Sequence, residues 1–289
     1  MTGGPAPLPF VDLHCHSTAS DGALPPAAVV EEAHRKGLHA LALTDHDTVA
    51  GLAEAQAAGE RLGVRIVPGV ELSAVENDVE THLLGLHLSD VGIMEQRLIA
   101  LRDMRRTRAE RMVERLNALG VPVTMEQVLA NAAGGAIGRP HVARAVVTVG
   151  SAADMREAFD RYLGNGRPAC VGKDRLSMRD AIGMVHEAGG IALLAHPGEA
   201  ANRTRLVALA EQGLDGCEVR HPGHSDEAIG RIGRLVEDLG LLPSGGSDWH
   251  GTFDGWRTLG VMQVPLAWLE RQDAHLAARR AGQRAVQAT

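Results

Sequence analysis

The chain has 289 residues, a formal net charge of −7 and 45% hydrophobic residues, which suits one globular α/β domain or one such domain with an insertion. No apolar run reaches the about 20 residues of a membrane span, and the first nine residues lack the basic and apolar regions of a signal peptide. Three cysteines without CxxC spacing, Cys15, Cys170 and Cys217, argue against a disulfide framework and favour a cytoplasmic location.

Before and after the middle of the chain, short apolar runs alternate with helical patterns. In the first part we predict strands at 9–16, 39–47, 65–73 and 80–88, and helices at 25–37 and 49–63. In the last part we predict strands at 191–197, 216–221 and 242–250, and helices at 203–213 and 226–240. Strands that alternate with helices are typical of parallel βαβ units, and about seven of them suggest a barrel or a closed parallel sheet.

The stretch from residue 93 to 170 breaks this alternation. Its patterns are helical throughout, at 94–120, 125–134, 139–150 and 153–166. We therefore predict an α/β barrel domain formed by residues 1–92 and 171–289, and a helical insertion, or cap, formed by residues 93–170. Residues 95–170 hold 12 Arg and no Lys against 8 Asp and Glu, whereas the remainder holds 17 basic and 28 acidic residues. Such a basic segment could attract an anionic substrate, although a solvated helix surface is an equally good explanation.

Histidines and carboxylates recur where the predicted strands end. Asp12, His14 and His16 alternate along the first strand, so they share one face, and Cys15 faces the other way. Later strands or the loops after them carry Asp21, Asp45, His46, Glu71, His82, His196, Asp248 and His250. The carboxyl ends of parallel strands form one edge, where sites are usual. A single histidine there is usually a core residue, but six with nearby carboxylates need compensation, which divalent metal ions supply.

The runs VDLHCHSTASDG, LTDHDT, GVELS, LAHPG and GGSDWHG together resemble the PHP (polymerase and histidinol phosphatase) family over nearly the whole chain. The middle runs IGRPHVARAVV and FDRYLGNGRP resemble its stand-alone members that act as nucleoside 3′,5′-bisphosphate phosphatases or short-RNA 5′→3′ exonucleases. The resemblance implies a distorted (β/α)7 barrel of the PHP type with an α-helical insertion.

The resemblance also implies three clustered metal positions. The first would be held by His14, His16, Glu71 and Asp248. Glu71 would bridge to the second, which His82 and His196 complete, and the third would be held by Asp21, His46 and His250. Asp21 stands where many relatives have His, and its oxygen favours Mn or Fe over an all-Zn site. We therefore expect two or three divalent ions, with Mn as the first choice and Fe or Zn as alternatives.

The reaction implied is hydrolysis of a phosphate ester by a metal-activated water. Asp45 and Asp12 are candidates to accept a hydrogen bond from metal-bound imidazoles. By resemblance, Arg139 and His141 of the insertion bind substrate, with Lys173 as a second candidate cation. His221 or His224 could donate a proton to the leaving group, and His221 is also a candidate substrate contact.

The predicted substrate is a small nucleotide, with the 3′-phosphate of a nucleoside 3′,5′-bisphosphate first, or a short RNA attacked from its 5′ end. Histidinol phosphate or a sugar phosphate would fit the same site. A non-catalytic metal-binding PHP module is the alternative from another class, and the full ligand set argues against it. An amidohydrolase usually needs a carboxylated lysine, and no lysine ends a predicted strand. The net acidity argues against binding of long duplex nucleic acid.

Overall fold

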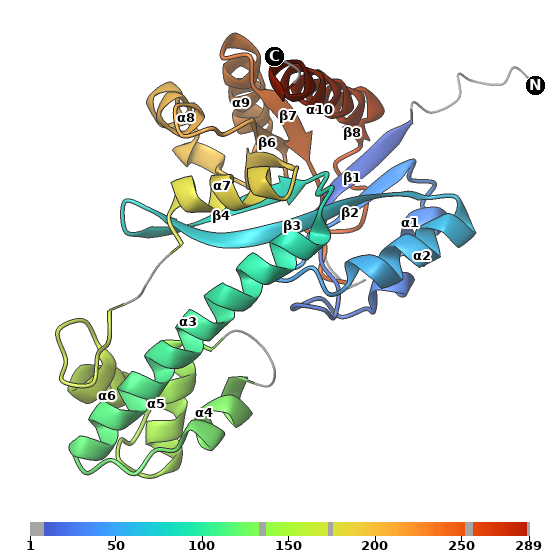
Figure 1. The fold of residues 1–289 in the computed structure, drawn as a ribbon. Helices are drawn as coiled ribbons and strands as arrows, with labels where there is room; N and C mark the ends of the chain where they lie inside the picture. Colours follow the sequence, from blue (N-terminus) through green and yellow to red (C-terminus); the bar gives the residue numbers. More distant parts are fainter. Residues whose placement is uncertain (1–8, 133–136, 173–175, 252–256, 288–289) are drawn as a thin grey trace, which may run out of the picture. The chain divides into compact units, whose positions relative to one another are not determined.

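The computed structural model describes residues 9–132, 137–172, 176–251 and 257–287 (Figure 1). The chain forms two compact units, one made of Met1–Glu95 with Leu176–Thr289 and the other of Gln96–Arg175. Each unit has its own buried apolar core, so the two are described separately.

The first unit is built on one eight-stranded sheet with the spatial order β7-β6-β5-β4-β3-β2-β1-β8. The strands are β1 Phe10–Cys15, β2 Ala40–Leu43, β3 Arg65–Glu76, β4 Val79–Leu86, β5 Ile191–Leu194, β6 Gly216–Arg220, β7 Leu242–Gly245 and β8 Val264–Pro265. The backbone after β7 meets β1: Asp248 N donates to His14 O at 2.8 Å, and His16 N donates to Trp249 O at 2.9 Å. The sheet therefore nearly closes, and the predicted barrel is confirmed, with β8 as an additional short strand.

One strand departs from the predicted parallel arrangement, because β4 pairs antiparallel with both β3 and β5. Only Asn77 and Asp78 connect β3 to β4, and their φ angles of 49° and 66° are those of a tight hairpin turn. A parallel crossover needs about a dozen residues, so a two-residue connection permits only the antiparallel pair. The hairpin places His82 opposite Ser73, two positions along β3 from Glu71.

Helices flank this sheet (Figure 1). They are α1 Pro26–Arg35, α2 Leu52–Leu62, α7 Met178–Glu187, α8 Arg203–Ala210, α9 Asp226–Asp238 and α10 Leu266–Gln287, with a short 3-10 turn η2 at Gly198–Ala200. One buried core joins Val11 and Leu13 of β1 to Leu269 of α10. Since Asp12 and His14 alternate with these apolar residues along β1, they project from the opposite face of the strand.

The second unit is helical, as the sequence predicts for this part of the chain. It contains most of α3, which spans Val91–Ala118, then α4 Met125–Ala132, α5 Arg139–Thr148, α6 Met155–Ala158 and the π-helical turn η1 Phe159–Leu163. Its core buries Met112 and Leu116 of α3 together with Val142 and Val146 of α5. Among the helices that the structure describes, none combines the length and the apolarity that crossing a membrane requires.

Candidate metal centre

The carboxylate of Glu71, in the middle of β3, lies at the centre of a ring of imidazoles. Five imidazole nitrogens lie 2.9–3.3 Å from its two oxygens, and they belong to His14, His16, His46, His82 and His196. Oε1 faces His82 and His196, and Oε2 faces the other three. Glu71 has no exposed surface, so this carboxylate has the geometry of a bridge between neighbouring cations.

Three groups of side chains present ligand atoms within 4.8 Å of one another and could each hold a metal ion. They are His14, His16, Glu71 and Asp248; His46, Glu71 and His82; and His16, Asp21, His46 and His250. The groups share His16, Glu71 and His46, so ions bound in them would be neighbours. The ninth predicted ligand, His196, contacts the cluster through Glu71 Oε1, where its Nε2 lies 3.0 Å away. The structure thus brings all nine predicted ligands together.

His16 provides a test of whether this cluster suits metal ions. Both of its ring nitrogens are buried, and neither makes a hydrogen bond with any residue that the structure describes. Glu71 Oε2 and Asp248 Oδ1 nevertheless each lie 3.2 Å from its Nε2. A buried polar group left unsatisfied costs about 1–3 kcal/mol. Ligand atoms that crowd together without good hydrogen-bond geometry are what a shared cation would satisfy, so the donor set fits divalent metal ions.

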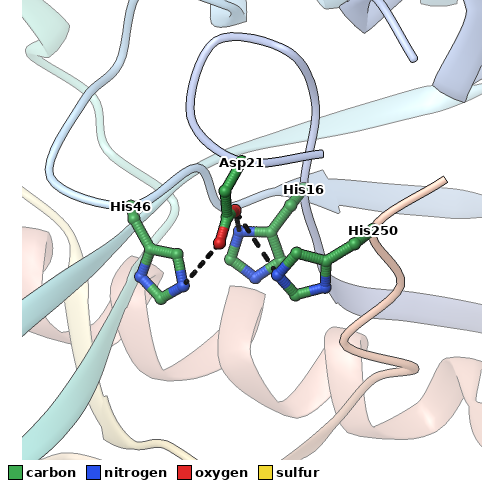
Figure 2. A group of neighbouring side chains, drawn as sticks. All are labelled: His16, Asp21, His46 and His250. Atoms are coloured by element: carbon green, nitrogen blue, oxygen red, sulfur yellow. Dashed lines mark ion pairs between the residues drawn. The ribbon is translucent and has the colours of Figure 1, made fainter. Parts of the chain in front are cut away.

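Asp21 lies in the loop after β1 and faces three imidazoles (Figure 2). Its oxygens lie 3.4 Å from His250 Nε2, 3.7 Å from His16 Nδ1 and 3.9 Å from His46 Nε2. The hydrogen bond with His250 lowers the pKa of Asp21 to about 2, which burial opposes and the charges of the rings assist. Asp21 is therefore ionised near neutral pH and is available as an anionic oxygen ligand.

Two buried carboxylates are also held in the charged form. Burial by itself would raise the pKa of Glu71, but the charge of His14 and hydrogen bonds from His14, His16 and His196 outweigh it and hold that pKa well below its usual value. Burial likewise opposes the lowered pKa of Asp248, and hydrogen bonds from His16 and His221 outweigh it. The centre is thus an anionic pocket, which favours cations.

Asp12 and Asp45 do not contact the imidazoles, so their predicted role as partners of metal-bound histidines is wrong. Asp45 accepts hydrogen bonds from Ser17 N, Ser17 Oγ and Ser20 Oγ, each at 2.7 Å, and so fixes the loop that carries Asp21. Asp12 accepts from Ser247 N at 3.0 Å and Gly260 N at 2.7 Å. Both side chains are consumed by unpaired backbone donors of loops, which a sequence pattern does not reveal.

The carboxylate that does hold an imidazole is Glu218 on β6, which the sequence analysis missed. It is fully buried, and its Oε1 lies 3.2 Å from His14 Nδ1 while Oε2 accepts from His196 N at 2.8 Å. An acidic residue within the otherwise apolar run GCEV of a buried strand is the signal that could have identified it. Glu218 fixes the orientation of His14 with its Nε2 toward Glu71, as outer carboxylates do at metal sites.

The histidines after β6 have structural partners. His221 Nδ1 accepts from Gly223 N at 3.0 Å, and its Nε2 lies 3.3 Å from Asp248 Oδ2. His224 Nδ1 donates to Val219 O at 2.9 Å, and its Nε2 accepts from Gly198 N at 3.1 Å. Since both rings are buried and fully engaged, the geometry contradicts the predicted proton donation by His224 and substrate contact by His221. Both positions support the loops and ligands of the centre instead.

Two predicted substrate residues lie in the second unit. Arg139 begins α5, and its Nη1 donates to Asn165 Oδ1 at 2.9 Å. His141 Nδ1 accepts from Gly138 N at 3.0 Å and so caps the first turn of α5. Lys173 lies outside the described residues. The substrate roles of these three residues stay predictions.

Three comparisons identify relatives of the chain. A 5′-3′ exoribonuclease from Haemophilus influenzae is 36% identical over 86% of this chain and 92% of its own length. A 3′,5′-nucleoside bisphosphate phosphatase from Chromobacterium violaceum is 36% identical over 86% of this chain and 90% of its own length. The structure of a protein from Bifidobacterium adolescentis, inferred to be a metal-dependent phosphoesterase, matches 92% of this chain and 96% of its own with 34% identity and a TM-score of 0.67.

The fold and the centre therefore define a hydrolase of phosphate esters, and the predicted enzyme class is confirmed. The PHP domain model matches residues 12–165, and the chain belongs to the PHP domain family. The predicted resemblance is confirmed with it.

Proposed function

We propose that the chain is a metal-dependent phosphatase that removes the 3′-phosphate from nucleoside 3′,5′-bisphosphates. The observation that carries the proposal is the Glu71 carboxylate surrounded by five imidazoles, with three overlapping groups of metal ligands. Overlapping groups place cations close enough to contact one phosphate together, which is how multi-metal phosphoesterases clamp their substrates. The C. violaceum relative, a 3′,5′-nucleoside bisphosphate phosphatase, supports this choice of substrate.

The residues of the chain have separable tasks in this reaction. When bound, divalent ions supply the Lewis acidity that activates a water molecule and offsets charge on the phosphate. His14, His16, Asp21, His46, Glu71, His82, His196, Asp248 and His250 would hold them. Glu218 and His221 hold His14 and Asp248 in place, and Asp45 holds the loop of Asp21. Because carboxylate oxygens complete the site, Mn is the first ion to test, followed by Fe and Zn.

A second candidate substrate is the 5′ end of a short RNA, which the basic second unit favours. Residues 96–175 hold 14 Lys and Arg against 8 Asp and Glu, in a chain with a net charge of −7. Such a segment attracts phosphates. The H. influenzae relative is a 5′-3′ exoribonuclease. We propose that Arg139, His141 and Lys173 of this unit recognise the second phosphate of either substrate.

Phosphate release from adenosine 3′,5′-bisphosphate by the Mn-loaded full chain tests the proposal, with metal content measured on the same sample. Release from the 3′ position together with two or three ions per chain is the expected result. A 5′-phosphorylated RNA of a few nucleotides and histidinol phosphate serve as competing substrates. Faster turnover of either would replace the bisphosphate, and bound metal without hydrolysis of any phosphate ester would refute the proposed activity.

A further inference from the structure

A guanidinium lies at the edge of the metal centre, and no sequence motif pointed to it. Arg257 follows β7 and precedes β8 in the first unit, and its Nη1 lies 2.5 Å from Asp248 Oδ2. The other oxygen of this carboxylate, Oδ1, lies 3.4 Å from His14 Nε2 and 3.2 Å from His16 Nε2. Asp248 therefore faces the metal ligands with one oxygen and Arg257 with the other.

A permanent positive charge at this position opposes the binding of metal ions. Two like charges a few ångströms apart near a protein surface repel by several kcal/mol at an effective dielectric constant of about 20. Arginine remains protonated at any ordinary pH, so titration cannot remove the repulsion. A cation retained beside a group of metal ligands is favourable only if an anion joins the same site and interacts with both.

The chemistry of Arg257 matches a phosphoryl group. Its side chain is 37% exposed, whereas that of Asp248 is 12% exposed, so the guanidinium is the more accessible of the pair. The planar guanidinium can donate two parallel hydrogen bonds to two phosphate oxygens. One edge can thus remain on Asp248 while the other N–H groups point to a ligand. Unlike Arg139, Arg257 belongs to the same compact unit as the metal ligands.

From this geometry we infer that Arg257 is a substrate-binding residue that contacts the oxygens of the phosphoryl group held at the metal centre. The inference rests on the proposed phosphoesterase function and assigns one further contact to it. Because the guanidinium binds the ground state and the transition state alike, its removal should raise the Michaelis constant (KM) more than it lowers kcat.

The test compares Arg257→Gln and Arg257→Lys with the parent chain, all loaded with Mn. Arg257→Gln should weaken inorganic phosphate binding, measured by calorimetry, by about tenfold or more, and should raise KM for adenosine 3′,5′-bisphosphate similarly. Arg257→Lys should fall between the two, because it keeps the charge but loses the fork. Mn affinity should stay equal or increase once the repelling charge is gone.

Arg65→Gln is the matched control. Arg65 also pairs with an aspartate, Asp273, at 2.6 Å, but it begins β3, at the opposite end of the strand from Glu76. This variant should leave phosphate binding unchanged. If Arg257→Gln weakens Mn binding and leaves phosphate binding intact, Arg257 only positions Asp248 and the inference is wrong. A parent chain that binds phosphate but hydrolyses no ester would instead refute the proposed function, and the calorimetric comparison would still decide the role of Arg257.

Discussion

Glu218 shows at the residue scale how a buried charge tunes the metal centre. The charges of Glu71 and Glu218 raise the pKa of His14 well above its usual value, against the effect of burial. With Glu218 at Nδ1, the Nε2 atom of His14 is directed to Glu71 and Asp248. Glu218 thus determines which nitrogen of His14 is presented to a metal ion.

We expect Glu218→Gln to reduce Mn affinity about 10- to 100-fold, as loss of an outer carboxylate does at other metal sites. The amide keeps one acceptor but removes the negative charge that makes His14 a better ligand. Competition with a fluorescent chelator measures the affinity. Glu32→Gln is the control, because Glu32 is also buried but pairs with Arg35 on α1. Equal Mn affinities in the two variants would contradict the role of Glu218.

His224 offers a second test at the residue scale. Burial lowers the pKa of His224, and its two nitrogens already hold backbone groups at Val219 and Gly198. We expect His224→Gln to reduce the melting temperature while leaving the alkaline limb of the pH–rate profile unchanged. A shift of that limb by a full pH unit would restore the role of His224 as the proton donor.

At the scale of elements, the β3–β4 hairpin positions His82 relative to Glu71. Asn77 has a φ of 49°, a left-handed conformation that β-branched residues strongly avoid. We expect Asn77→Val to lower the free energy of unfolding by about 1–2 kcal/mol. Asn77→Gly is the control and should be neutral or slightly stabilising, because glycine adopts this conformation without strain. Urea denaturation measures both, and equal stabilities would show that the turn tolerates another conformation.

Asp215 connects three elements of the first unit. Its Oδ2 accepts from Ala192 N of β5 at 2.8 Å and lies 2.8 Å from His186 Nε2 of α7. Its Oδ1 lies 3.8 Å from Arg279 Nη1 of α10. Burial opposes ionisation, but these hydrogen bonds and charges outweigh it and lower the pKa of Asp215 below its ordinary value of 3.8.

We expect Asp215→Asn to lower the free energy of unfolding by about 2 kcal/mol at pH 7. Because the folded pKa is lowered, this stabilisation is fully present above about pH 4 and is lost as the pH falls through the folded pKa. The difference between the variant and the parent chain should therefore shrink at pH 3. Asp273→Asn, at a more exposed ion pair with Arg65, should cost less than about 1 kcal/mol. Urea denaturation at both pH values gives the comparison.

At the scale of the whole molecule, metal binding and folding should be linked. The ligands come from β1, β3, β4 and the loops after β1, β2, β5 and β7, so ions bind only when the barrel has formed. Mn at 100 times its dissociation constant should add about 2.7 kcal/mol per ion to the stability. We expect the melting temperature to rise by several degrees with Mn and to fall again with EDTA. In Glu71→Gln this increment should largely disappear, since the shared ligand loses its charge.

The sequence predicts most of the centre because strand periodicity and strand ends carry positional information. His14 and His16 lie on one face by the period of two, and His46, His196 and Asp248 follow strands that end at one edge. Glu71 was placed at a strand end, but β3 continues to Glu76, because its long hairpin with β4 extends both strands. The antiparallel direction of β4 escaped a pattern that registers strands but not their pairing partners.

The amino-acid sequence by itself determined the barrel class, the helical middle segment, the family and the set of candidate ligands. These depend on local periodicity and on residue types at fixed spacing, which folding preserves. Only the tertiary structure decided which carboxylates serve the imidazoles and which serve the backbone. Asp12 and Asp45 satisfy loop N–H groups, Glu218 reaches His14 across 204 residues, and Arg257 meets Asp248. Those partners are fixed by distances between segments remote in sequence, so no local pattern can encode them.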